Sequence, residues 1–255
     1  MEDYIVSLVV CGVISWAALF ISVRKMFPKK SFSFCNRVVS TIHASLGVIL
    51  ASLSVQSWTC PVCPMASPSS PFQVYISVSF FLSLCFLNLV LYSFITNLQM
   101  QTLAVTLAYM IYDLICCFFG PGHFNIDNAV HHLVSIIGIG AGLSYQMCGS
   151  ELVAALWVTE ISSPFLHARE LLKELGYKDT DLNLLADISF AVIFSIARMG
   201  VGPYITYITL SAENPLLIKI MGSGLQLVSA FWFYKIVMMV RYKLFKRNKA
   251  SNKVN

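Results

Sequence analysis

Charged side chains are scarce in this chain of 255 residues, where Asp, Glu, Lys and Arg together make up 11%. Soluble globular domains carry roughly 25%, so this composition excludes a soluble globule. Hydrophobic residues make up 57% of the chain, and the mean hydropathy is +0.74. The sequence therefore predicts an all-α, polytopic bundle of transmembrane helices. Nucleic acid is not an expected partner.

The cysteines do not form the repeated pairs of a zinc site. Most lie within apolar segments, where a cysteine behaves as a small apolar residue. Cys60 and Cys63 differ, because they lie in a turn-rich, proline-rich stretch that we expect on the lumenal side. A local disulfide is predicted there in preference to a redox or zinc centre.

Eight segments are apolar enough to be membrane helices. They are Tyr4–Val23, Val38–Trp58, Val74–Ile95, Leu103–Phe119, Ala129–Tyr145, Glu151–Pro164, Leu184–Leu210 and Leu216–Val240. The first has about the 20 residues that a bilayer crossing needs, and we interpret it as a signal anchor. The chain thus divides into an anchor and basic loop at 1–32, a membrane domain at 33–243 and a basic tail at 244–255.

The distribution of Lys and Arg tests whether all eight segments cross the membrane. Positive residues concentrate on the cytosolic side of membrane proteins. Eight crossings would place six Lys and Arg on the cytosolic side and nine on the other. Seven crossings place fourteen on the cytosolic side and only Lys219 on the other. Seven crossings are therefore predicted, with the N-terminus in the lumen and the C-terminus in the cytosol.

Seven crossings result when Val74–Ile95 does not cross the membrane. This segment is rich in Phe, Ser, Leu and Val, and no charge, glycine or proline lies between Phe72 and Met100. We predict that residues 74–100 are an insertion that lies against the bundle and does not thread it.

Polar residues from several spans fall in the same, cytosolic half of the membrane in a topology of seven crossings. They are His43, Asp113, His131, His132, Glu160 and Asp187. Polar groups within spans face the bundle interior or a water-filled cavity. The sequence therefore predicts one polar pocket that opens to the cytosol.

The adjacent His131 and His132 are the centre of this predicted pocket. An imidazole beside a carboxylate is held in one tautomer and becomes a stronger base, and Asp113, Glu160 and Asp187 are the candidate partners. The alternative is a structural pair that hydrogen-bonds between helices. A metal held by both histidines is not expected, because adjacent residues point about 100° apart on a helix.

Three smaller features accompany the histidines. Arg198 lies in the middle of an apolar span, and we expect it to clamp Asp113 or Glu160; the alternative is that it holds a substrate phosphate or carboxylate. Pro164 is expected to bend or stop its span. A small-xxx-small pair of glycines, at positions 138 and 142, predicts close helix packing.

Several motifs carry a resemblance to a known family. They are Tyr109-Met-Ile-Tyr-Asp113, the pair His131-His132 followed by Ser135-Ile-Ile-Gly138, Glu160-Ile-Ser-Ser-Pro-Phe165 with His167 and Arg169, and Arg198-Met-Gly-Val-Gly202. Over about residues 33–243 the sequence resembles the TLC family, and in particular its small members. That family takes its name from the translocating-chain-associating membrane protein, the ceramide synthases and a neuronal ceroid lipofuscinosis protein.

The resemblance implies a protein of the endoplasmic reticulum membrane that acts in lipid synthesis, sensing or transport. It implies a membrane lipid as partner and adds Tyr109, Ser135 and Ser163 to the substrate pocket. In ceramide synthases the histidine pair works with acidic residues on a later span, and the matching position is Glu160. A second acid is missing at 162–164, which speaks against N-acylation of a sphingoid base.

Two hypotheses follow from the resemblance and the polar residues together. In the first, His131 or His132 is the general base for transfer of a fatty acyl group from acyl-CoA to a lipid amine or hydroxyl, with Glu160 or Asp113 orienting it. That reaction needs acyl-CoA as co-substrate and no resident cofactor or metal. In the second, the pocket recognises a lipid headgroup without catalysis. A homo-oligomer is compatible with either.

Overall fold

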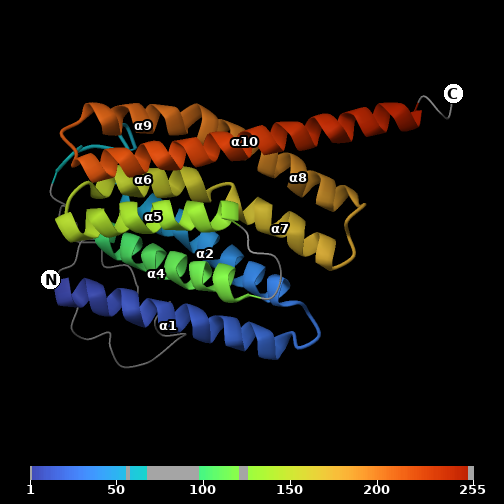
Figure 1. Cartoon of the computed structure of the whole chain (residues 1–255), viewed down its shortest axis with the longest axis horizontal. Helices are drawn as coiled ribbons and strands as arrows, with labels where there is room; N and C mark the ends of the chain where they lie inside the picture. The colour runs from blue at the N-terminus through green and yellow to red at the C-terminus, as the bar shows by residue number, and fades with distance from the viewer. Residues whose placement is uncertain (1, 56–57, 68–97, 121–125, 252–255) are drawn as a thin grey trace.

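The computed structural model describes residues 2–55, 58–67, 98–120 and 126–251, which form helices and short connections with no strand among them. The helices are α1 (Glu2–Met26), α2 (Phe32–Ser54), α4 (Leu98–Phe119), α5 (Ile126–Tyr145), α6 (Gly149–Glu160), α7 (Ser163–Glu174), α8 (Asp181–Phe194), the π-helix η2 (Ser195–Val201), α9 (Gly202–Ser211) and α10 (Leu216–Ser251). They lie side by side along the long axis of the molecule (Figure 1). The predicted all-α bundle is confirmed.

The bundle has two ends that differ in chemistry. We call the end formed by the α1–α2 turn, the start of α5 and α7 the histidine end, and Ser31 of that turn donates to Glu174 of α7 at 2.6 Å. We call the opposite end, which carries residues 58–67, the disulfide end, because Cys60 and Cys63 are joined there as expected. The two termini lie at opposite ends of the long axis (Figure 1).

Among the residues that the structure describes, six helical stretches are long and apolar enough to cross a membrane. The remaining pass is α6, whose 12 residues span only about 18 Å at 1.5 Å per residue. Since a bilayer core is roughly 30 Å thick, α6 reaches only part of the way, and α7 continues the chain beyond it. The described chain therefore makes seven passes of alternating direction, six of them full length.

The chain leaves and re-enters the described bundle at the same end on either side of Val74–Ile95. Ser67 accepts a hydrogen bond from Cys148 at the start of α6, and Gln99 near the start of α4 donates to Ser150. Val74–Ile95 itself lies outside the described residues, so the predicted insertion stays a prediction.

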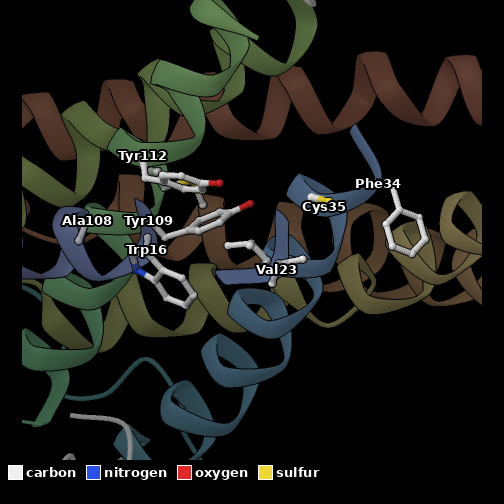
Figure 2. Close-up of a cluster of buried hydrophobic side chains, with 9 residues drawn as sticks. Trp16, Val23, Phe34, Cys35, Ala108, Tyr109 and Tyr112 are labelled. Atoms are coloured by element: carbon white, nitrogen blue, oxygen red, sulfur yellow. The ribbon is translucent and has the colours of Figure 1, made fainter. Parts of the chain in front are cut away.

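The helices α1, α2 and α4 pack through a cluster of buried aromatic side chains at the histidine end. Trp16 of α1 meets Tyr109 of α4 edge to face at 5.5 Å, and Figure 2 shows both rings beside Tyr112. Aromatic pairs in this geometry contribute about 0.5–1.5 kcal/mol beyond their buried area. This cluster fixes one wall of the region that holds the histidines.

Close helix contacts depend on particular glycines. A Cβ on Gly138 would lie 3.2 Å from Met221 Cβ, which confirms the predicted close packing of α5, here against α10. An even closer approach of two Cβ positions occurs at Gly12 of α1, where a Cβ would lie 2.6 Å from Ala108 Cβ of α4. A helix can approach this closely only where the side chain is absent.

Replacing Gly12 by alanine is expected to destabilise the protein by about 1–3 kcal/mol, because the two helices must move apart. Gly140→Ala is the matched control, since no atom lies within 4 Å of its added Cβ. Alanine there is expected to stabilise α5 by up to about 1 kcal/mol through helix propensity. Thermal unfolding in detergent measures both, and equal effects at the two sites would contradict the predicted contact.

The span predicted at Glu151–Pro164 is divided differently in the structure. The break falls at residues 161–162, and Pro164 lies in the first turn of α7. Proline is tolerated there because the first helical residues have no intrahelical acceptor for an N–H. The predicted bend is present, but the proline begins the next helix and does not end the span.

Candidate functional site

A cavity of about 410 Å³ lies at the histidine end, between α2, α4, α5, α6, α7, α8, η2 and α10. A cavity of this size can hold several water molecules or a small polar group. Its lining includes most of the residues placed in the pocket from the sequence, namely His43, Tyr109, Asp113, His131, His132, Glu160, Ser163 and Arg198. We call this space the histidine cavity.

His132 of α5 pairs with Asp113 of α4. His132 Nε2 lies 2.8 Å from Asp113 Oδ2, and both side chains are buried. On the other side of the carboxylate, Asn36 donates to Oδ1 at 2.7 Å and itself accepts a hydrogen bond from the Tyr112 hydroxyl at 2.7 Å. A carboxylate held in this way fixes the orientation of the ring beside it.

The second nitrogen of His132 is also engaged. Nδ1 lies 2.9 Å from the sulfur of Met110, which is a weak acceptor. Both ring nitrogens therefore contact protein atoms, and His132 is held as a fixed part of the cavity wall.

His131 is placed differently from its neighbour. Its ring is buried against Trp232 of α10, with 5.0 Å between the ring centroids, and its Nδ1 has no hydrogen-bond partner among the described residues. Adjacent residues on a helix point about 100° apart, which explains why only one of the pair reaches Asp113. His131 thus lines the cavity with a buried Nδ1 whose hydrogen-bonding capacity is unused among the described residues.

His43 lies deeper along α2 and forms part of the cavity floor. Its ring stacks on Tyr109 with 3.7 Å between centroids and meets the edge of Trp16 at 5.6 Å. These aromatic contacts fix the ring, while Nε2 has no hydrogen-bond partner among the described residues. The position is that of a rigid wall residue with one free polar atom.

The sequence suggested that Arg198 clamps Asp113 or Glu160, but the structure gives it a different partner. Its Nη2 donates to the backbone carbonyl of Thr159, and its guanidinium lies 5.0 Å from the Phe194 ring and 5.7 Å from the Trp232 ring. The carbonyls of the last helical turn lack intrahelical partners, so the end of α6 offers an acceptor that a sequence does not reveal. The described residues include no ion pair between Arg198 and either carboxylate.

The π-helix η2 carries Arg198 to this position. Single π-helical turns are rare and are often found at functional sites. Within this π-helix, the backbone carbonyl of Arg198 accepts a hydrogen bond from the side-chain amide of Gln226 of α10 at 3.2 Å. Nε and Nη1 of Arg198 are buried without a hydrogen-bond partner among the described residues, so two donors of the guanidinium are unused in this arrangement.

Glu160 and Ser163 lie on either side of the break between α6 and α7. Glu160 is buried near Gly47 of α2, and the charge of Arg198 acts on it. Ser163 donates to the carbonyl of Thr159 at 3.3 Å. The break thus turns polar groups from two helices toward the cavity.

Two predicted pocket residues lie outside the histidine cavity. Asp187 pairs with Arg169 of α7 at 3.3 Å and does not line the cavity. Ser135 is one turn deeper along α5 than the histidines and lines a smaller cavity of about 90 Å³ between α5, α6, α9 and α10. Both positions depend on how far neighbouring helices are shifted along one another, and a single sequence does not reveal that shift.

Several cavity residues were not among the predicted site residues. Trp232 and Lys235 come from α10, Ser162 from the break before α7, and Asp127, which forms an ion pair with Lys235, from the start of α5. Lys235 is a cation within an apolar run, and this signal could have identified it. No pattern in the sequence distinguishes Trp232 from the other aromatic residues of α10.

His167, which the sequence indicated only as part of a family motif, also lines the cavity. It lies on α7 beyond the spans, its Nδ1 is buried without a hydrogen-bond partner among the described residues, and burial, aided by the charge of Arg37, lowers its pKa to about 4. The pKa of an unfolded histidine is about 6.5. The folded protein therefore keeps His167 neutral at neutral pH.

Lowering the pH is expected to destabilise the protein through His167. Because the folded pKa lies below the unfolded one, this contribution is fully present above pH 6.5 and is lost as the pH falls toward about 4. The loss is at most about 3 kcal/mol. Thermal unfolding across this range measures it, and His167→Gln should flatten the dependence; the same slope in both proteins would contradict the assignment.

Comparison with known proteins places this geometry in a family. Residues 26–238 match the TLC domain. The chain is also 26% identical over 150 residues to a putative TLC domain-containing protein of Acanthamoeba polyphaga mimivirus, an alignment that covers 56% of this chain and 74% of the viral protein. The TLC domain match runs from α2 into α10 and includes residues from every helix that lines the histidine cavity. The chain therefore belongs to the TLC domain family of membrane proteins.

Proposed function

We propose that this protein binds a membrane lipid with its headgroup in the histidine cavity and transfers a fatty acyl group from acyl-CoA to an amine or hydroxyl of that lipid. The observation that carries the proposal is the His131 Nδ1, which has no hydrogen-bond partner among the described residues, at a cavity of about 410 Å³ beside the pair of His132 and Asp113. Membership of the TLC domain family supports a lipid as the ligand.

His131 is the general base in this proposal. Its free nitrogen takes the proton of the acceptor amine or hydroxyl as that group attacks the thioester carbonyl; a C–N or C–O bond forms, the C–S bond breaks, and the thiol leaves with the proton. Base catalysis of this kind contributes about 10²- to 10⁴-fold. The pair of Asp113 and His132 forms a fixed part of the cavity wall, and the His132 ring lies 5.5 Å from the ring of His131.

Arg198 supplies positive charge to the same reaction. Its two unpaired donors suit a phosphate of the headgroup or of acyl-CoA, because guanidinium groups bind such oxygens with paired hydrogen bonds. Glu160 is near enough for the positive charge of that guanidinium to act on its carboxyl group. This arrangement supports an anionic group held between η2 and α6.

The proposed orientation places the histidine end in the cytosol, where acyl-CoA is available, and the protein in the endoplasmic reticulum. The basic α1–α2 turn and the basic C-terminal segment support it, since Lys and Arg favour the cytosolic side. A glycosylation acceptor added after Asn255 is therefore expected to stay unmodified, and one added before Met1 is expected to be modified. Glycosylation at the C-terminus would contradict this orientation.

Lipid binding without catalysis is the second candidate. Two observations favour it: both nitrogens of His132 are engaged by protein atoms, and the site has Ser162 and Ser163 where ceramide synthases have their second acid. In this function the cavity recognises a headgroup and the histidines serve as hydrogen-bonding groups.

Lipid profiles separate the two candidates. Cells that lack the protein would receive either the wild type or the double variant His131→Ala/His132→Ala at equal protein level, and the acyl chains of their sphingolipids and phospholipids would be measured. Acyl transfer predicts a lipid class that the wild type restores and the variant does not. Identical acyl profiles with a folded variant would rule out catalysis and leave the binding function.

A further inference from the structure

Asp113, Cys117 and His132 form a cluster at the edge of the histidine cavity. Asp113 and Cys117 are one turn apart on α4 and share a face of that helix, and His132 faces them from α5. One ligand-type atom from each, a carboxylate oxygen, the thiol sulfur and an imidazole nitrogen, lies within 4.8 Å of the others. We propose that these three side chains bind a divalent metal ion, with zinc the best fit.

The donor set selects the metal. Zinc is bound by Cys sulfur at about 2.3 Å, His nitrogen at about 2.0–2.1 Å and carboxylate oxygen at about 2.0–2.2 Å. A mixed sulfur, nitrogen and oxygen set excludes magnesium and calcium, which prefer oxygen ligands alone. His131 and His132 point about 100° apart and cannot both bind one ion. The proposed site does not require this, because only His132 is a ligand.

Charge balance favours the bound state within the membrane. A carboxylate and a thiolate together carry two negative charges, which a divalent cation neutralises. Burying an unpaired charge in an apolar medium is costly, so the neutral assembly is favourable where the separate ions are not. Binding releases the thiol proton of Cys117 and requires His132 in its neutral form.

The groups around the cluster resemble the outer shell of a metal site. Asn36 donates to one oxygen of Asp113 and leaves the other toward His132, and Tyr112 in turn holds Asn36. Such second contacts orient metal-ligating carboxylates. Three protein ligands leave a fourth position of a tetrahedral ion open to water or a bound molecule.

This metal site goes beyond acyl transfer. Cys117 does not line the histidine cavity, and His131, the proposed base, is not among the ligands. The ion would join α4 to α5 and hold the ring of His132 in place, so it acts as a clamp on the cavity wall. Its presence can be measured without any lipid substrate.

Metal content of the whole protein, purified in detergent without a histidine tag, tests the proposal. Zinc measured by mass spectrometry is expected at one equivalent per chain. Cys117→Ser should lower it at least tenfold, whereas Cys116→Ser, a change of the adjacent half-buried thiol outside the cluster, should leave it unchanged. Cobalt loaded in place of zinc should give a thiolate-to-cobalt absorption band that only Cys117→Ser removes.

Two results would overturn the proposal. One is wild-type protein without zinc that also gives no cobalt band. The other is equal zinc in the wild type and Cys117→Ser, which would place the metal elsewhere. If Cys117→Ser does not fold, Cys117→His provides the decision, since histidine is a zinc ligand: retained zinc supports the site, and a folded Cys117→His protein without zinc contradicts it.

Discussion

Replacing His131 by alanine is expected to lower the rate of acyl transfer by about 10²- to 10⁴-fold, because this is the usual contribution of a positioned general base. The variant loses the packing of the ring against Trp232 but no hydrogen bond to Nδ1 among the described residues, so thermal unfolding is measured beside the rate to establish that it is folded. The measurement is transfer of a labelled acyl group from acyl-CoA to lipid in membranes that contain equal amounts of each protein.

Val130→Ala is the matched control for this experiment. Val130 precedes His131 on α5 but is 45% exposed on the outer face of the bundle, so its loss should leave the rate within about twofold. The pH profile adds a second measurement, because removing the base should remove the limb of the profile that reports its deprotonation. A rate for His131→Ala equal to that of Val130→Ala would exclude His131 as the base.

Replacing Asp113 by alanine is expected to destabilise the protein by about 3–5 kcal/mol, the usual effect of breaking a buried pair. The change would remove the partner of His132 Nε2 at 2.8 Å and of the Asn36 amide at 2.7 Å, and would leave a buried ring and a half-buried amide without that acceptor. Thermal unfolding in detergent, followed by the loss of helical circular dichroism, provides the measurement.

Asp127→Ala is the control for the Asp113 experiment. Asp127 also pairs with a cation, Lys235, but both side chains are exposed at the mouth of the cavity. Exposed pairs contribute about 0–1 kcal/mol, so the two aspartates should differ several-fold in their effect. Equal losses of stability would show that the Asp113 pair is no more important than a surface contact.

The membrane spans were predictable from the sequence because their signal is local. A long apolar run has to cross or lie in a membrane whatever its neighbours are, and the helices α1, α2, α4, α5 and α10 occupy the expected segments within a few residues at most boundaries. The convergence of His43, Asp113 and the two histidines was predictable for a similar reason. The depth of each residue in the membrane follows from its position along its span, once the Lys and Arg distribution has given the direction of that span.

The partners of these residues were not predictable. Asp187 was a candidate partner for the histidines and instead pairs with Arg169, while Arg198 meets a backbone carbonyl at the end of α6. Both outcomes depend on where one helix stops and how far its neighbour is shifted along it. A shift of one residue rotates a side chain by about 100°, and no pattern in a single chain records that shift.

Composition and charge therefore determined by themselves that this chain is a helical membrane bundle, and the depth of its polar residues determined where a pocket would form. Only the tertiary structure decided that His132 is fixed by Asp113 while His131 keeps a free nitrogen. The physical reason is that hydrophobicity is a property of each residue, whereas a hydrogen bond requires two atoms from different helices to meet within about 3 Å.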